Sequence, residues 1–74
     1  MANYELNAKG LLCPMPVIKV QQKIQQLSKG DILMVYCTDP GAQFVLPAWC
    51  RVHGHTLLAV QQQPHEITIS LRVG

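Results

Sequence analysis

The sequence predicts an α+β fold, a two-layer α/β sandwich in which two helices lie on one face of a four-stranded mixed sheet. Hydrophobic spacing alternates between strand-like and helix-like segments in the order β-α-β-α-β-β, and Gly or Pro separates most of them. A right-handed crossover places the first helix on one face of the sheet. Because the chain has few elements, the second helix is expected on the same face. With 74 residues, the chain is expected to form one domain, residues 1–74.

The first elements are a short strand at Tyr4–Asn7 and a helix from about Pro14 to Ser28. The strand alternates polar and apolar residues, and Gly10 then breaks that pattern. A proline is tolerated in the first turn of a helix, and Gly30 suits its C-terminal end. The apolar positions of the helix recur at helical spacing: Val17, Val20, Ile24 and Leu27.

A central strand is predicted at Ile32–Cys37, because this run is apolar without alternation and so suits the middle of a sheet. Turn residues follow at 38–41, with Asp39 as a possible cap. The second helix ends at Gly54 and either begins near Pro47 or is kinked there, two alternatives that the sequence leaves open. Its expected buried stripe consists of Val45, Ala48, Trp49 and Val52.

Two strands are predicted in the last third of the chain, at Thr56–Val60 and Ile67–Val73. Apolar and polar residues alternate in the second of them, which is typical of a strand with one buried face. The stretch Gln63–His65 contains a proline and is expected to form the hairpin between them.

Composition argues against several classes of function. The formal charge is +2, the cations are scattered and aromatics are few, so direct nucleic-acid binding is not expected. No apolar run approaches the ~20 residues of a membrane-spanning helix, and the first residues lack a signal-peptide core, so a cytoplasmic protein is expected. The three cysteines, Cys13, Cys37 and Cys50, are expected to be reduced thiols, because their number is odd and no Cys-x-x-Cys occurs.

Cys13 is the candidate functional residue, because it stands at or beside the N-cap of the first predicted helix. The positive end of the helix dipole stabilises a thiolate, which is the nucleophilic form of cysteine. Pro14 and Pro16 stiffen the turn and lack N–H groups, so the Met15 N–H is the remaining donor expected near the sulfur. Without a second cysteine or a general base nearby, the thiol suits a group carrier better than a redox catalyst. The alternative is a structural cysteine that fills the helix start.

Other polar residues are assigned lesser roles. Lys9, four residues before the thiol, is a hypothetical cation that would favour the anionic persulfide. Cys37 and Cys50 are expected in the core, as free cysteines usually are. Cys50, His53 and His55 make an incomplete ligand set for structural zinc, so no metal site and no cofactor are predicted.

The stretch from Gly10 to Val17 resembles the Gly-Leu-x-Cys-Pro-x-Pro-hydrophobic signature of the TusA/SirA-like sulfur carriers. Further resemblances follow in family order, at Gly30–Val35, Thr38–Ala42, Pro47–Arg51 and Gly54–His55. Together they cover nearly the whole chain. The resemblance implies the same β-α-β-α-β-β sandwich that the spacing predicts.

The resemblance further implies that Cys13 receives a persulfide sulfur from a cysteine desulfurase or a rhodanese-like donor and passes it to an acceptor protein. Such a carrier transfers sulfur without turning over a small substrate by itself. Branches of the family serve tRNA thiolation, molybdenum-cofactor assembly or sulfur oxidation. A monomer is expected when the protein is free. The alternative function is a regulatory or protein-binding module with a structural cysteine.

Two positions depart from the family pattern. Asn7 and Val45 stand where the family usually has aspartate, so two negative charges are missing. If those acids help to dock partners, this chain uses different partners. The sequence leaves open which donor and acceptor it serves and whether Lys9 or Cys50 assists.

Overall fold

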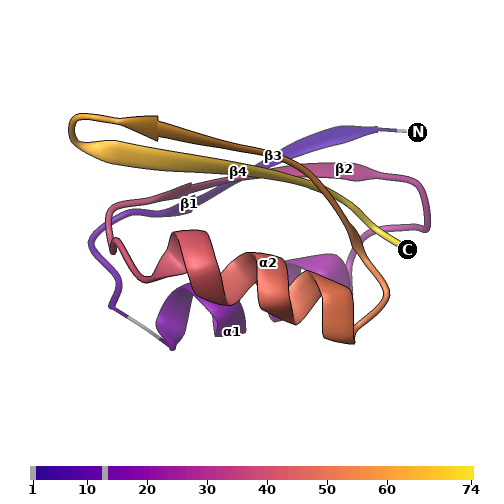
Figure 1. Cartoon of the computed structure of the whole chain (residues 1–74). Coiled ribbons are helices and arrows are strands. Elements are labelled where there is room, and N and C mark those ends of the chain that lie inside the picture. Colours follow the sequence, from indigo (N-terminus) through magenta and orange to yellow (C-terminus); the bar gives the residue numbers. More distant parts are fainter. Residues whose placement is uncertain (1, 13) are drawn as a thin grey trace.

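The computed structural model describes residues 2–12 and 14–74, and its elements follow the predicted order. They are β1 (Asn3–Ala8), α1 (Met15–Ile24), β2 (Ile32–Cys37), α2 (Ala42–Val52), β3 (Thr56–Gln63) and β4 (Glu66–Arg72). The strand order is β1-β2-β4-β3, with β1 parallel to β2 and the other pairs antiparallel. Both helices lie on one face of this mixed sheet (Figure 1), which confirms the predicted two-layer α/β fold.

The bounds of the elements differ from the prediction at several ends. Helix α1 starts at Met15 and stops at Ile24, four residues before Ser28. Beyond it, the amides of Gln26 and Leu27 bond to carbonyls three residues back, so the chain continues as tighter turns. Strand β3 is three residues longer than expected, and β1 is longer by one residue at each end. These strands extend because each added residue pairs with a neighbouring strand.

The open question about Pro47 is resolved, because α2 starts at Ala42 and continues through the proline. Pro47 has no N–H, so the carbonyl four residues earlier, at Gln43, receives no helical hydrogen bond from it. The second helix therefore contains a proline in its interior, whereas Pro16 of α1 lies in the first turn.

The core lies between the sheet and the helices. Strand β2, one of the two inner strands, alternates fully buried residues on the helix side with half-buried ones on the open side. The prediction that β2 is covered on most sides was therefore only half right. The largest fully buried side chains are Val20, Leu33, Val35, Leu46, Ile69 and Leu71.

The predicted buried stripe of the second helix was wrong. The side chains of α2 that enter the core are Ala42, Leu46 and Cys50, spaced four residues apart. Of the predicted stripe, Trp49 is partly buried against the core, whereas Val52 is 78% exposed. Phe44 is also 72% exposed. Because α2 is apolar on two sides, its sequence periodicity does not reveal which side faces the sheet.

The two ends of the sheet carry different parts of the chain. The register aligns Ala8, Cys37 and Ile67 at one end, which carries the loop from β1 to α1 and the β3–β4 hairpin. The chain ends lie at the opposite end of the sheet (Figure 1). Both helices, with 10 and 11 residues, are too short to cross a membrane, and no longer helix occurs in residues 2–12 and 14–74.

Candidate functional site

The loop between β1 and α1 contains the predicted site, but Cys13 itself lies outside the described residues. On one side of it, Leu12 is 73% exposed, and on the other, Pro14 is exposed and occupies the N-cap position of α1. Pro16 is fully buried, so the start of the helix is anchored in the core. The chain thus presents both neighbours of Cys13 to solvent at the beginning of a ten-residue helix.

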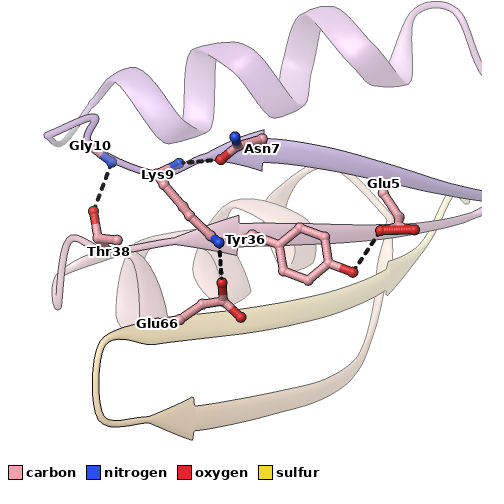
Figure 2. Close-up of polar contacts among 7 residues, drawn as sticks. All are labelled: Glu5, Asn7, Lys9, Gly10, Tyr36, Thr38 and Glu66. Carbon is pink, nitrogen blue, oxygen red and sulfur yellow. Dashed lines mark hydrogen bonds and ion pairs between the residues drawn. The ribbon is translucent and has the colours of Figure 1, made fainter.

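Gly10 and Thr38 fix the entry to this loop. Gly10 has a φ of +78°, a backbone conformation that other residues adopt only with strain. Its N–H donates to the hydroxyl oxygen of Thr38 at 2.8 Å, as Figure 2 shows. This bond ties the loop to the residue that follows β2, a connection between two sequence motifs that the spacing alone does not reveal.

The Met15 amide, which was expected as a donor near the sulfur of Cys13, has a backbone partner. Its N–H donates to the carbonyl oxygen of Leu12 at 2.8 Å and so closes a turn at the start of α1. Its contact with the sulfur stays a prediction, because Cys13 lies outside the described residues. The remaining electrostatic contribution of α1 is the positive end of its dipole, which favours an anion near the first turn.

The cation hypothesis for Lys9 is not supported by its contacts. Its ammonium nitrogen lies 2.6 Å from a carboxylate oxygen of Glu66 on β4, across the open face of the sheet (Figure 2). It also lies 5.9 Å from the centre of the Tyr36 ring. The Tyr36 hydroxyl donates to Glu5 at 2.9 Å, and this bond raises the pKa of Tyr36. Lys9 is therefore part of a network on the sheet surface, where Glu66 balances its charge.

Asn7 shows what its departure from the family pattern changes. Its side-chain oxygen accepts a hydrogen bond from the Lys9 N–H at 3.0 Å. Such short-range bonds from Asn or Asp side chains stabilise turns, and an aspartate oxygen can accept the same bond. The replacement therefore removes a charge and leaves this turn in place.

The other two cysteines are free thiols in the core, as predicted. Burial raises the pKa of Cys37 to about 11, and nearby Asp39 adds to the increase. Burial also raises the pKa of Cys50. Because a thiol reacts as its thiolate, both are poor nucleophiles at neutral pH.

His53 and His55 are engaged with Trp49. Their ring centres lie 4.8 Å and 5.2 Å from that of the indole. The Nδ1 atom of His55 accepts a hydrogen bond from the N–H of Gly74 at 3.1 Å. In the described part of the chain, no three His, Cys, Asp or Glu side chains are grouped so that they could hold a metal ion.

The sequence-based assignment missed an apolar groove on the outside of α2. It has a volume of about 440 Å³ and is lined by Phe44, Val45, Ala48, Trp49, Val52 and His53. A signal was present, because α2 carries apolar residues on more positions than one buried face requires.

Comparison with known proteins places this geometry in a family. The family model described as sulfurtransferase TusA matches residues 4–73. The sulfur carrier protein TusA of Pseudomonas syringae is 42% identical over 59 residues, which are 80% of this chain and 70% of that protein. YrkF of Bacillus subtilis is 36% identical over 73 residues, and this chain spans only 40% of its length.

A solved structure shows the same fold. The SirA-like protein from Desulfitobacterium hafniense superposes with a TM-score of 0.82, covering 96% of this chain and 97% of that one, at 19% identity. Together with the family match over nearly the whole length, this confirms the resemblance seen in the sequence. The chain belongs to the sulfurtransferase TusA family.

Proposed function

We propose that this protein is a sulfur carrier that accepts a persulfide sulfur on Cys13 and relays it to an acceptor protein. The observation that carries the proposal is the contrast among the cysteines. Cys37 and Cys50 are buried with raised pKa values, whereas Cys13 directly precedes the N-cap of α1 and has exposed neighbours. A position before a helix start lowers the pKa of a thiol and makes it the reactive one.

The transfer needs no external oxidant. The Cys13 thiolate attacks the terminal sulfur of a donor persulfide, a new S–S bond forms at Cys13, and the S–S bond of the donor breaks. The donor cysteine leaves as a thiolate, so electrons balance and no cofactor is consumed. A cysteine desulfurase or a rhodanese-like protein is the proposed donor. In the second transfer, an acceptor cysteine thiolate attacks the terminal sulfur on Cys13, and Cys13 leaves as a thiolate.

The destination of the sulfur is the wider part of the proposal. Family members described as sulfur carriers support a relay between proteins, and tRNA thiolation, molybdenum-cofactor assembly and sulfur oxidation are the candidate pathways. We further propose that residues 1–74 act as one domain, as a free monomer in the cytoplasm. The reduced state of Cys37 and Cys50 suits that compartment.

Intact-mass measurement tests the assignment. After incubation with a cysteine desulfurase and cysteine, the protein is expected to gain the mass of one sulfur atom, and reductant is expected to remove it. Cys13→Ser is expected to gain none, whereas the control Cys50→Ala retains the gain. Sulfur uptake by Cys13→Ser, or none by the unmodified chain, contradicts the proposal.

Alkylation of the folded protein at several pH values provides a second check. One thiol is expected to react rapidly and with a depressed pKa, and two are expected to react only on unfolding. Three slow thiols would instead support a regulatory module with a structural cysteine.

A further inference from the structure

The loop that contains Cys13 is bonded to the end of strand β2. The last pair of the β1–β2 ladder is Ala8 and Cys37, and both residues are fully buried. Two positions after Ala8, the Gly10 N–H donates to the hydroxyl oxygen of Thr38 at 2.8 Å (Figure 2). Thr38 directly follows the last residue of β2. This bond therefore carries the connection between the two strands into the loop, three residues before Cys13.

The neighbouring backbone donors of the loop bond locally. The Lys9 amide donates to the side-chain oxygen of Asn7 at 3.0 Å. The Leu11 amide donates to a carbonyl three residues back at 3.4 Å, which is longer than the usual range for a hydrogen bond. In the described part of the loop, the amide of Gly10 is thus the backbone donor that reaches another element, and its acceptor is a side chain, that of Thr38.

Both partners of this bond are suited to hold a fixed geometry. Gly10 has a φ of +78°, and no atom beyond its chain neighbours lies within 4 Å of the place that a Cβ would occupy. Conformation, and not lack of space, is therefore the reason for glycine here. Thr38 is β-branched, so its side chain has few accessible rotamers. The end of β2 thus holds the accepting hydroxyl at a defined place.

The bond contributes more to the direction of the loop than to the stability of the fold. Gly10 and Thr38 are both exposed, so water can replace the bond when it is lost. Packing holds the loop at Leu11 and again at Pro16, whereas Leu12, next to Cys13, is exposed. The direction in which the chain leaves the sheet therefore depends on the contact between Gly10 and Thr38.

We propose that Thr38 is a positioning residue for sulfur transfer: through the Gly10 N–H, its hydroxyl sets the direction in which the loop presents Cys13 to the persulfide of a partner protein. The proposal rests on the proposed function. The attacking thiolate must approach in line with the S–S bond that breaks, and a misplacement of about 1 Å can cost about 100-fold in rate. The proposal also gives a role to the first residue of the stretch Thr38–Ala42, one of the family resemblances in the sequence.

Single-turnover transfer from a persulfide-loaded cysteine desulfurase tests the proposal. Thr38→Val keeps the branched shape without the hydroxyl and is expected to lower the maximal transfer rate about ten-fold. The concentration of the chain at half-maximal rate is expected to change less than about two-fold, because the variant alters orientation and not docking. Thr38→Ser restores an acceptor and is expected to retain about half of the maximal rate or more. An unchanged rate for Thr38→Val, or no rescue by serine, would overturn the proposal.

Thr56→Val is the matched control. Thr56 is also exposed and lies at the start of β3, where it pairs with Arg72 at the opposite end of the sheet. The same change of side chain there is expected to leave the transfer rate as it is. A loss equal to that of Thr38→Val would mean that the effect does not depend on the Cys13 loop, and it would contradict the proposal.

Small reagents separate the direction of the thiol from its intrinsic reactivity. In Thr38→Val, the rates of iodoacetamide alkylation and of inorganic polysulfide loading at Cys13 are expected to change less than about two-fold, because small reagents approach an exposed loop from many directions. Equal losses with these reagents and with the desulfurase would show that Thr38 acts on the thiolate itself and would overturn the proposal. Failure of polysulfide to load Cys13 of the unmodified chain contradicts the sulfur-carrier function instead.

The Gly10 amide provides a test that needs no partner protein. Its hydrogen is expected to exchange with solvent about ten-fold faster in Thr38→Val than in the unmodified chain, and Thr38→Ser is expected to restore slow exchange. Gly10→Ala strains the positive φ without a steric contact and is expected to lower the transfer rate as Thr38→Val does. All variants are compared at a temperature at which circular dichroism shows them folded. Unchanged exchange of the Gly10 amide in Thr38→Val would show that the hydroxyl does not hold the loop, which contradicts the inference.

Discussion

The two helices cover the same face of the sheet, yet their outer sides differ in how much apolar surface they expose. Helix α1 exposes mainly polar residues such as Lys19 and Gln22, and its exposed apolar residues, Met15 and Ile18, are only about 40% exposed, at 42% and 39%. On α2, Phe44 and Val52 are more than 70% exposed, at 72% and 78%. Polar residues on the solvent side are the ordinary arrangement for a helix that packs on a core. Packing on the sheet therefore accounts for most of α1, whereas Phe44 and Val52 give α2 more exposed apolar surface than that packing requires.

The largest expected change in the free energy of unfolding distinguishes the buried side of α2 from its exposed side. Leu46→Ala removes a fully buried side chain and is expected to lower the free energy of unfolding by about 2–5 kcal/mol. Phe44→Ala, two residues away and largely exposed, is expected to change it by about 0.5 kcal/mol or less. Urea unfolding followed by circular dichroism measures both. Similar losses for the two variants would mean that Phe44 belongs to the core.

An intermediate effect compares the prolines of the two helices. Pro47→Ala restores an N–H inside α2 and is expected to raise the free energy of unfolding by about 1–2 kcal/mol, after allowing for the freer unfolded chain. Pro16→Ala, at a fully buried first-turn position, loses packing and rigidity and is expected to lower it by about 1–2 kcal/mol. Thermal unfolding of both variants provides the measurement, and shifts of the same sign would contradict the assigned roles.

The smallest expected effect is the pH dependence of stability that arises from one titratable residue after each helix. After α2, burial lowers the pKa of His55, with a smaller contribution from His53. The folded state binds this proton less readily than the unfolded state, so stability is expected to fall as pH drops below about 6.5. After α1, hydrogen bonds from the Ser28 and Ala2 amides lower the pKa of Asp31. Its contribution is complete above its ordinary pKa of 3.8 and is lost as pH falls through the lower folded value.

Midpoints of urea unfolding, measured from pH 7 to pH 2, test whether His55 causes the first loss of stability and Asp31 the later one. His55→Gln is expected to flatten the decline that begins near neutral pH, and Asp31→Asn the decline at acidic pH. The reverse assignment, or a decline that neither variant changes, would show that other groups dominate.

Much of the fold could be predicted from sequence, because each element has a distinct hydrophobic period. The strand β2 was located to the residue, and the layered arrangement followed from the order of elements. The inward face of α2 was not predictable in the same way. Apolar residues occupy two sides of that helix, and only packing against β3 and β4 selects Leu46 and Cys50.

Features of the candidate site that depend on local sequence could be predicted. Contacts between residues far apart in the sequence could not. The burial of Cys37 and Cys50 follows from their apolar surroundings in sequence. The contacts of Lys9 with Glu66 and of Gly10 with Thr38 join residues that lie 57 and 28 positions apart. Local spacing carries no information on such pairs, so Lys9 was assigned to the loop instead of the sheet surface.

The location of the chain ends has a practical consequence. Ala2 and Gly74 are held at the end of the sheet opposite the Gly10–Thr38 contact, Ala2 by Asp31 and Gly74 by His55. An affinity tag, a dye or a whole fused protein attached at either end would point away from the loop that contains Cys13. The protein can therefore be tethered to a sensor surface through Gly74 with this loop still facing the solution.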